Sequence, residues 1–339
     1  MSPVLAHRAL PRRSLLKLAG GTATAGALLG VSGCGLLGGS QSAEGGNGLV
    51  EKANLRVGAL PINDLAPLHL AVRNGLFRQE GLTVEIITAA DGASALNSTI
   101  GGDYDITYSS YVPFFQAQAR GVAQLKIVAD CASAAPNSTV IMTSPRSKVR
   151  RPPDLAGKKI AISGPATISE LLVKATMRAY GVDFDKVRFV PIPFINMPAA
   201  LQQDQVDAAI LTEPFLTLAA RNSGAVPVVD AATGPLEDLP LTGYGATTKF
   251  CTENPKTIAA FQRAMDRAVA EAQDRSKIEP LLPEFAKIDK ETASIITLLK
   301  FNSRADATRL QRVPRLMRDF GFINTDVDVD GMIVPPPRN

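Results

Sequence analysis

Short apolar segments rich in β-branched residues alternate with amphipathic stretches along the chain from residue 54 onward. A short apolar run predicts a buried strand, and apolar positions three and four residues apart predict a helix. Regular alternation of the two predicts βαβ units, and therefore an α/β fold with mainly parallel sheets flanked by helices. The first predicted strands span 55–60, 83–88, 105–108 and 126–130, with helices beginning near Asp64, Asp91 and Tyr111.

A second series of predicted strands begins after an extended segment at 139–143, which we expect to cross outward from the first series. Its strands span 159–163, 188–191, 208–212 and 226–229. After the Gly- and Pro-rich stretch 234–245, the pattern predicts a strand at 245–250. A helix should follow, with Asn254 as its cap and Pro255 in its first turn. Further helices, without strands between them, are expected to about Phe320.

This order of elements predicts two lobes joined by two hinge segments. The first lobe is discontinuous and comprises residues 51–140 and 244–339, because the C-terminal helices are expected to cover it. The second lobe, 141–243, is then an insertion. The length left after the N-terminal segment is sufficient for two lobes with substantial cores.

The first 33 residues have the composition of an export signal. A basic region containing Arg12 and Arg13 precedes the apolar run 18–31, which is too short to span a membrane. The arginine pair followed by Leu-Leu-Lys resembles the twin-arginine motif, and residues 31–34, Val-Ser-Gly-Cys, resemble a bacterial lipobox. These resemblances imply cleavage before Cys34, palmitate on that cysteine and a position on the outer face of the cytoplasmic membrane. The alternative is an ordinary anchor helix.

Residues 34–50 are rich in Gly and Ser and predict a flexible tether. The formal charge of +4 is carried by the predicted signal, because its four basic residues have no acidic partner there. Without them the chain has 32 basic and 32 acidic residues, so the composition does not support nucleic-acid binding. Cys131 and Cys251 could form a disulfide or remain thiols. The spacing of potential ligands predicts no metal site, and we expect no cofactor.

Ligands of open α/β sheets bind outside the carboxyl ends of the strands. Six predicted loops qualify, three from each lobe: 61–67, 91–95, 109–113, 164–168, 194–198 and 212–214. Two lobes that present such loops across a cleft, linked by two hinges, predict a clamshell that closes on a small molecule.

Polar, small or aromatic residues in these loops are the candidate ligand contacts. They are Pro61, Asn63, Asp64, Asp91, Gly92, Ser109, Ser110, Tyr111, Gly164, Ala166, Thr167, Phe194, Asn196 and Glu213. Helix capping is the alternative role for the Asp and Asn residues and for the serines before Tyr111. Thr167 and Glu170 also have the spacing of a capping box. His69, among apolar neighbours, is expected to be a packing residue.

Four segments of the chain carry a family resemblance: LHLAVRNGLFRQE (68–80), GDYDITYS (102–109), LAGKKIAISGPATISELLVKATMRAYGV (155–182) and VDAAILTEPF (206–215). Together they resemble the substrate-binding proteins that serve ABC importers of nitrate, sulfonates, taurine and thiamine precursors. The resemblance implies a type II periplasmic-binding fold and a monomeric receptor that works with a permease and its ATPase. It also implies that the loop 164–167 presents backbone amides to the ligand. Glutamate is a poor helix cap, so Glu213 is expected to face the ligand, and a solvated charge at a helix start is its alternative.

The charges of the six loops predict the class of ligand. The loops contain Asp64, Asp91 and Glu213 but no Lys or Arg. A desolvated anion normally meets a guanidinium or several hydroxyl and amide donors. The loops therefore favour an amine-bearing or heterocyclic ligand, such as a thiamine-type pyrimidine or an aminosulfonate, with Glu213 accepting an N–H.

Catalysis is not predicted. The chain has neither a Gly-x-Ser-x-Gly elbow nor a Walker-type loop, and no histidine lies in the candidate pocket. A ligand-sensing lipoprotein that signals to a membrane partner is the main alternative to transport, and an enzyme on the same frame is the remote one.

Overall fold

Two mixed β-sheets organise the chain in the computed structural model, which describes residues 50–337. The predictions for Arg12, Arg13 and Cys34 lie outside the described residues. The first sheet has the order β11-β4-β10-β3-β1-β2. Its strands are β1 (Asn54–Ala59), β2 (Thr83–Thr88), β3 (Ile106–Ser110), β4 (Leu125–Ser133), β10 (Pro240–Thr247) and β11 (Lys300–Phe301).

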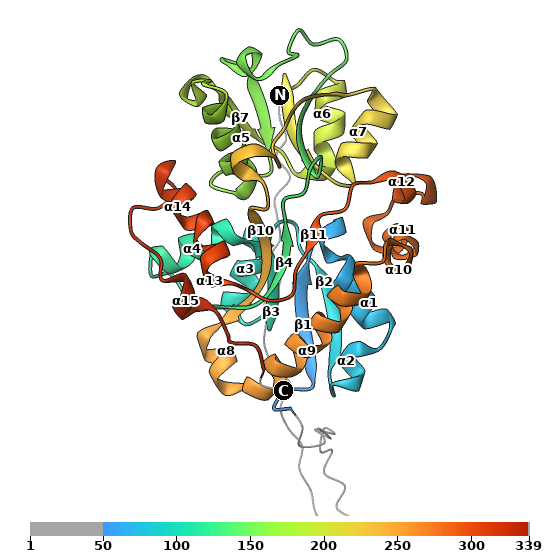
Figure 1. Ribbon diagram of the computed structural model, residues 1–339, viewed down its shortest axis with the longest axis vertical. Helices are drawn as coiled ribbons and strands as arrows, with labels where there is room; N and C mark the ends of the chain where they lie inside the picture. Colours follow the sequence, from blue (N-terminus) through green and yellow to red (C-terminus); the bar gives the residue numbers. More distant parts are fainter. Residues whose placement is uncertain (1–49, 338–339) are drawn as a thin grey trace, which may run out of the picture. The chain divides into compact units, whose positions relative to one another are not determined.

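The second sheet has the order β7-β6-β8-β5-β9. Its strands are β5 (Thr139–Thr143), β6 (Lys159–Ile162), β7 (Arg188–Pro191), β8 (Ala208–Thr212) and β9 (Val226–Asp230). We call the first sheet with its helices lobe I and the second sheet with its helices lobe II (Figure 1).

Helices connect and flank the strands. The α-helices are α1 (Ala66–Arg73), α2 (Leu76–Gln79), α3 (Gly92–Gly101), α4 (Tyr111–Ala119), α5 (Ile168–Ala179), α6 (Met197–Gln202), α7 (Phe215–Ser223), α8 (Thr248–Glu253), α9 (Pro255–Ala272), α10 (Arg275–Ile278), α11 (Leu282–Ala286), α12 (Lys290–Ile295), α13 (Ala307–Leu310), α14 (Arg312–Asp319) and α15 (Val329–Met332). Short 3-10 helices are η1 (Asn63–Leu65), η2 (Pro152–Leu155), η3 (Phe184–Lys186), η4 (Phe194–Asn196), η5 (Gly234–Leu236) and η6 (Glu279–Leu281).

The predicted βαβ units are the parallel parts of both sheets. Strand β1 pairs in parallel with β2 and β3, and β6 pairs in parallel with β7 and β8. The sheets are nevertheless mixed, because β10 and β5 run antiparallel to their neighbours. These two strands follow the segments where the chain passes from one sheet to the other, and each therefore enters its sheet from the opposite end.

The two passages lie between β4 and β5 and between β9 and β10. The strands of lobe II begin at Thr139, and the returning strand of lobe I begins at Pro240. Both positions are slightly earlier in the chain than the predicted lobe limits, and the division into hinged lobes stays a prediction.

The predicted strand 245–250 is wrong in its limits. The strand is Pro240–Thr247, and residues 248–253 form α8. Pro240 is tolerated because it is the first residue of the strand. Gly243 and Gly245 are required by packing rather than by a turn, since a Cβ would lie 2.5 Å from the Tyr111 hydroxyl or from the Phe114 ring of α4, respectively.

Two other predictions for the C-terminal part also need correction. A short strand does occur there, since β11 pairs antiparallel with Ala132 and Ser133 of β4. Asn254 is at the N-cap position of α9 with Pro255 in the first turn, as predicted, but its side chain makes no capping hydrogen bond and donates to the Phe250 carbonyl. Glu51 instead accepts from the Lys256 and Thr257 amides, so a carboxylate from the start of lobe I satisfies the first turn.

The C-terminal helices contact both lobes. Helix α9 packs against α1 in lobe I as predicted, whereas α12 reaches α7 and α14 reaches α5 in lobe II. The α14 contact includes an ion pair of 3.3 Å between Arg178 and Asp319 and an edge-to-face packing of Phe184 on Phe320.

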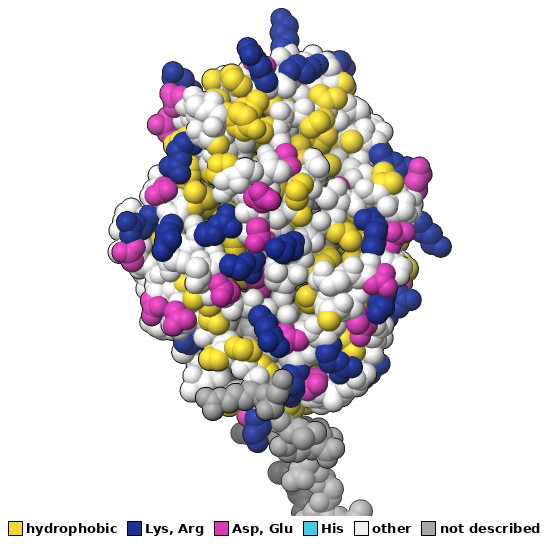
Figure 2. Space-filling model, in the orientation of Figure 1, with side chains coloured by type: hydrophobic (Ala, Val, Ile, Leu, Met, Phe, Trp, Pro, Cys, Tyr) yellow, Lys and Arg dark blue, Asp and Glu magenta, His cyan; other side chains and the backbone are white. Residues whose placement is uncertain are grey.

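Charged side chains of both signs are interspersed over the visible face of the molecule (Figure 2), in keeping with the balance of acidic and basic residues. Cys131 and Cys251 are both free thiols, which answers the question that the sequence left open. Within residues 50–337, no helix has the length and apolar character that a bilayer crossing requires.

Substitution of Gly245 tests the packing of β10 on α4. A methyl group there would meet the fully buried Phe114 ring, so Gly245→Ala should destabilise the fold by about 1–3 kcal/mol. Urea unfolding monitored by circular dichroism measures this change. Gly101→Ala is the matched control, because its Cβ would meet nothing within 4 Å. Equal stability of the two variants would contradict the packing argument.

His69 provides a second test. Its ring stacks on Phe285 at 4.0 Å, which confirms the predicted packing role, and burial lowers its pKa to about 4 from 6.5. The unfolded chain then binds more protons between these two values, so His69 contributes stability above pH 6.5 that is lost as the pH falls toward 4. His69→Phe keeps the stacking and should reduce the loss of unfolding free energy between pH 7 and 5 by about 1–2 kcal/mol. If the unfolding free energy of His69→Phe fell by as much between pH 7 and 5 as that of the wild type, this assignment would be contradicted.

Candidate ligand-binding cavity

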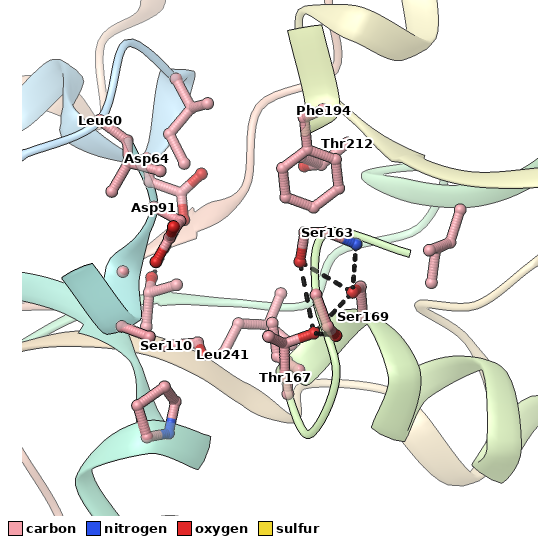
Figure 3. Close-up of a pocket in the computed structure, with 18 of the residues that line it drawn as sticks. Leu60, Asp64, Asp91, Ser110, Ser163, Thr167, Ser169, Phe194, Thr212 and Leu241 are labelled. Atoms are coloured by element: carbon pink, nitrogen blue, oxygen red, sulfur yellow. Dashed lines mark hydrogen bonds between the residues drawn. The ribbon is translucent and has the colours of Figure 1, made fainter. Parts of the chain in front are cut away.

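A cavity of about 350 Å³ lies between the two lobes, at the carboxyl ends of β1, β3, β6 and β8. In Figure 3, Asp64, Asp91 and Ser110 are on one wall and Ser163, Thr167, Ser169 and Phe194 are on the opposite wall. Each of the six predicted loops contributes at least one lining residue. The lining is mostly apolar, with a few polar side chains on each wall, which is the composition of small-molecule sites in general.

Seven of the candidate ligand contacts line this cavity. They are Asp64, Asp91, Gly92, Ser110, Gly164, Thr167 and Phe194. Two segments distant in the sequence, the 164–167 turn and the 91–92 turn, are thus brought to the same space. Their contact with a ligand remains a prediction.

The other seven candidates are not among the lining residues: Pro61, Asn63, Ser109, Tyr111, Ala166, Asn196 and Glu213. Asn63 donates to the Thr297 carbonyl at 3.0 Å, and the Tyr111 hydroxyl donates to Asp130 at 2.6 Å. Asn196 is exposed and makes no capping hydrogen bond. The contact of these seven residues with a ligand stays a prediction.

Glu213 is buried between the lobes. Its Oε1 accepts from the Thr217 hydroxyl at 2.8 Å and from the Thr297 amide at 3.1 Å, and its Oε2 accepts from the Thr217 amide. Burial raises the pKa of Glu213 against these hydrogen bonds, which lower it. Donors of the chain thus contact both oxygens, and the contact of this carboxylate with a ligand N–H stays a prediction. Sequence spacing alone could not reveal a partner 84 residues away.

Asp64 is the carboxylate that does reach the cavity. It lies inside η1 and caps no helix, so the capping alternative is wrong for this residue. The side chain is only 3% exposed. Its Oδ2 accepts from the Tyr108 hydroxyl at 2.8 Å and from the Thr242 hydroxyl at 3.0 Å, and its Oδ1 has no hydrogen-bond partner. Burial raises the pKa of Asp64, and the two hydroxyls only partly oppose this shift.

Asp91 has the capping role that was considered as its alternative. Its carboxylate accepts from the Ser94 amide at 2.8 Å and from the Ser94 hydroxyl at 2.9 Å, at the start of α3. The residue also lines the cavity. Gly92 allows this helix to approach β3, because a Cβ there would lie 2.5 Å from the Ser109 hydroxyl.

Three hydroxyls form a cluster on the lobe II wall. Ser163 and Thr167 each lie 2.8 Å from the Ser169 hydroxyl, and Thr167 also donates to the Gly164 carbonyl at 2.7 Å. Thr167 therefore does not cap α5, and the predicted capping box is wrong. Glu170 instead accepts from the Ala166 amide at 2.7 Å and pairs with Lys174 at 2.6 Å.

Several lining residues were missed by the sequence. They include Tyr108, Thr139, Ser163, Ser169, Thr212, Thr242 and most of the apolar lining. Ser163 and Thr212 could have been found, because each comes at or directly after the carboxyl end of a parallel strand. Thr139 and Thr242 lie on the antiparallel strands that enter from the other lobe, and no βαβ rule places them at the site.

The electrostatic character of the cavity follows from its lining. Asp64 and Asp91 line it, whereas none of its lining residues is Lys, Arg or His. Among residues 50–337, no group of three or more His, Cys, Asp and Glu side chains is arranged to hold a metal ion.

Comparison with curated proteins identifies relatives that are named for binding small molecules. The chain is 23% identical over 202 residues to the formylaminopyrimidine-binding protein of Halalkalibacterium halodurans. It is 27% identical over 198 residues to a protein of Escherichia coli K12 named for binding aliphatic sulfonates. Each match covers 58% of this chain and spans only 59% of the relative's length.

Solved structures share the fold. The alkanesulfonate-binding protein SsuA of Xanthomonas axonopodis pv. citri, bound to MOPS, superimposes with a TM-score of 0.73 at 19% identity, over 84% of this chain and 99% of that chain. The periplasmic nitrate-binding protein NrtA of Synechocystis PCC 6803 also gives 0.73, at 16% identity, over 84% and 86%. The two-lobed periplasmic-binding fold predicted from the sequence is thus confirmed.

A family model described as NMT1/THI5 like matches residues 62–277, which is more than half of the chain. The matched region contains β2 to β10, and it includes all six cavity loops except Pro61 of the first one. The resemblance drawn from the four sequence segments is confirmed, and the chain belongs to the NMT1/THI5-like family.

Proposed function

We propose that this protein is a solute receptor that binds a small ligand between its two lobes and delivers it to an ABC importer. The observation that carries the proposal is the 350 Å³ cavity, to which all six strand-end loops of both lobes contribute. A cavity shared in this way can be filled or emptied by a change in the angle between the lobes. Relatives named for binding a formylaminopyrimidine and sulfonates support a binding role.

The contacts between the lobes belong to a closed state. The Thr297 backbone accepts from Asn63 of lobe I through its carbonyl and donates to Glu213 of lobe II through its amide. On the surface, Arg221 of α7 pairs with Glu291 at 2.8 Å and with Asp289 at 3.2 Å. Opening would separate Glu213 and Arg221 from these partners, so a ligand that contacts both walls shifts the equilibrium toward closure.

The partners are a permease, which recognises the closed form, and its ATPase, with the receptor acting as a monomer and without turnover of the ligand. The ligand is small and amine-bearing or heterocyclic, since the cavity offers carboxylates and hydroxyls but no cationic side chain. Cys34 bears the lipid that keeps the receptor beside its permease on the outer face of the cytoplasmic membrane, at high local concentration.

Blocking the cavity tests the receptor role. Ala93 is an exposed lining residue of α3, so Ala93→Trp should fill the cavity without disturbing the core. The full chain carrying Cys34→Ser should release a small molecule on denaturation, which mass spectrometry can detect. Adding Ala93→Trp should abolish this release. Small-angle scattering should show a smaller radius of gyration for the loaded protein.

Asn97→Trp is the matched control, because Asn97 is exposed one turn further along α3 and does not line the cavity. This variant should retain both the bound molecule and the compaction. The proposal would be contradicted if no bound molecule reduced the radius of gyration. It would also be contradicted if Ala93→Trp carried as much bound molecule as the protein with an open cavity.

Replacement of Cys34 tests the anchor. Cells grown with an alkyne analogue of palmitate should label the wild-type chain, and Cys34→Ser should lose the label and appear in the soluble fraction. Cys251→Ser provides the control, since it removes a free thiol from the folded part of the chain. Replacing Arg12 and Arg13 by lysine should block export. A label that persists in Cys34→Ser would refute the anchor.

A further inference from the structure

One buried carboxylate oxygen at the cavity is left without a partner. Within residues 50–337, five buried side-chain polar atoms make no hydrogen bond, and they belong to Asn63, Asp64, Ser109, Gln116 and Thr176. Of these five residues only Asp64 lines the cavity. Its side chain projects toward the space between the two walls in Figure 3. Buried polar groups in proteins are nearly always hydrogen-bonded, so this oxygen indicates a partner that is not part of the chain.

Asp130, in the same lobe, shows how this chain satisfies a buried carboxylate with its own groups. Its Oδ1 accepts from the Tyr111 hydroxyl at 2.6 Å and from the Cys131 amide at 3.0 Å, and its Oδ2 pairs with the Arg309 guanidinium at 3.0 Å. Asp130 therefore has three donors, one of them charged. Asp64 has two neutral hydroxyls, both on Oδ2, and no cationic side chain lines the space before it.

The placement of the two hydroxyls orients the free oxygen. Tyr108 and Thr242 come from the adjacent strands β3 and β10, and both donate to the same atom, Oδ2. Both of their side chains are themselves buried, so the carboxylate is held from one side by two fixed donors. This arrangement fixes the orientation of the carboxylate and leaves Oδ1 as a buried acceptor at the cavity for which the chain supplies no donor.

We propose that Asp64 is the specificity-determining residue of the cavity and binds a protonated nitrogen of the ligand, an amine or an amidinium. This assignment rests on the proposed receptor function and narrows its ligand to a small organic cation. An ammonium or amidinium supplies both the missing donor and the missing counter-charge. Asp91 on the same wall adds a second negative charge, which further disfavours an anion.

The other residues that line the cavity indicate the chemical character of the uncharged part of this cation. Leu60, Ile62, Leu241 and Leu299 are among the apolar residues that line the cavity, so the part of the ligand that carries no charge is apolar. On the opposite wall the Phe194 ring offers a flat surface, held in place by stacking on Phe215 at 6.3 Å between centroids. The hydroxyl cluster of Ser163, Thr167 and Ser169 can serve one neutral polar group at the far end.

Binding measurements on matched probes test the assignment. Thermal shift and calorimetry are carried out on the full chain with Cys34→Ser, using benzamidine and benzylamine, their neutral isosteres benzamide and benzyl alcohol, and benzenesulfonate. The two cations should stabilise the protein, and their isosteres and the sulfonate should bind at least about tenfold more weakly, the ordinary value of a charged hydrogen bond. Because this comparison uses the unaltered site, it does not depend on the folding of any variant.

Asp64→Asn then removes the charge with little change of shape. It should weaken benzamidine binding by about tenfold or more, while its melting temperature without ligand should be retained or raised. Asp103→Asn makes the same change in lobe I, at an exposed residue that does not line the cavity. This control should alter benzamidine binding by less than about threefold, because only a long-range charge is lost.

The outcomes separate the two proposals. Tightest binding by benzenesulfonate or by a neutral isostere, or unchanged benzamidine binding in Asp64→Asn, would overturn the role of Asp64 and leave the receptor function intact. Failure of both cations to bind the unaltered site would also overturn it. A protein that binds none of these probes and carries no small molecule from its host would overturn the receptor function as well.

Discussion

The antiparallel pairing of β10 with β3 and β4 is the constraint on which the rest of the structure depends. This strand returns from lobe II and completes the sheet of lobe I, with Tyr244 opposite Tyr108 of β3 and Ala129 of β4. Its two glycines admit the aromatic rings of α4. Because β10 lies beside β4, the two passages between the lobes run next to each other, and the strand-end loops of lobe II are held opposite those of lobe I. The same strand supplies Thr242 to Asp64, so the closure of the sheet and the chemistry of the cavity share one element.

Most of the fold was predictable because it depends on local pattern. The strands 83–88, 139–143, 188–191 and 208–212 have the predicted limits, since each is a short apolar run bounded by turns. The strand β10 was misplaced because Gly and Pro normally indicate turns, whereas here Gly243 and Gly245 make room for rings from a helix more than 120 residues earlier in the chain. Such a requirement comes from tertiary packing and leaves no local signal. The same holds for Glu51, which caps α9 from the other end of the described chain.

The candidate site was predictable in its position but less so in its roles. The rule that ligands lie beyond the carboxyl ends of strands placed all six loops correctly around the cavity. It could not distinguish Glu213 from Asp64, because both are acidic residues in such loops. What distinguishes them is which donors surround them: Thr217 and Thr297 occupy both oxygens of Glu213, whereas Tyr108 and Thr242 occupy only one oxygen of Asp64. Partners of this kind are set by the packing of distant segments.

The hydrogen bonds of Thr297 give the C-terminal segment a part in the coupling of the two lobes. Its carbonyl is bonded to Asn63 of lobe I and its amide to Glu213 of lobe II, so the backbone of one residue spans the boundary. When the lobes separate, the Asn63 bond can persist while the amide loses its acceptor. The exchange rate of that single amide hydrogen with solvent therefore reports the open population directly, without any label on the protein and without knowledge of the ligand.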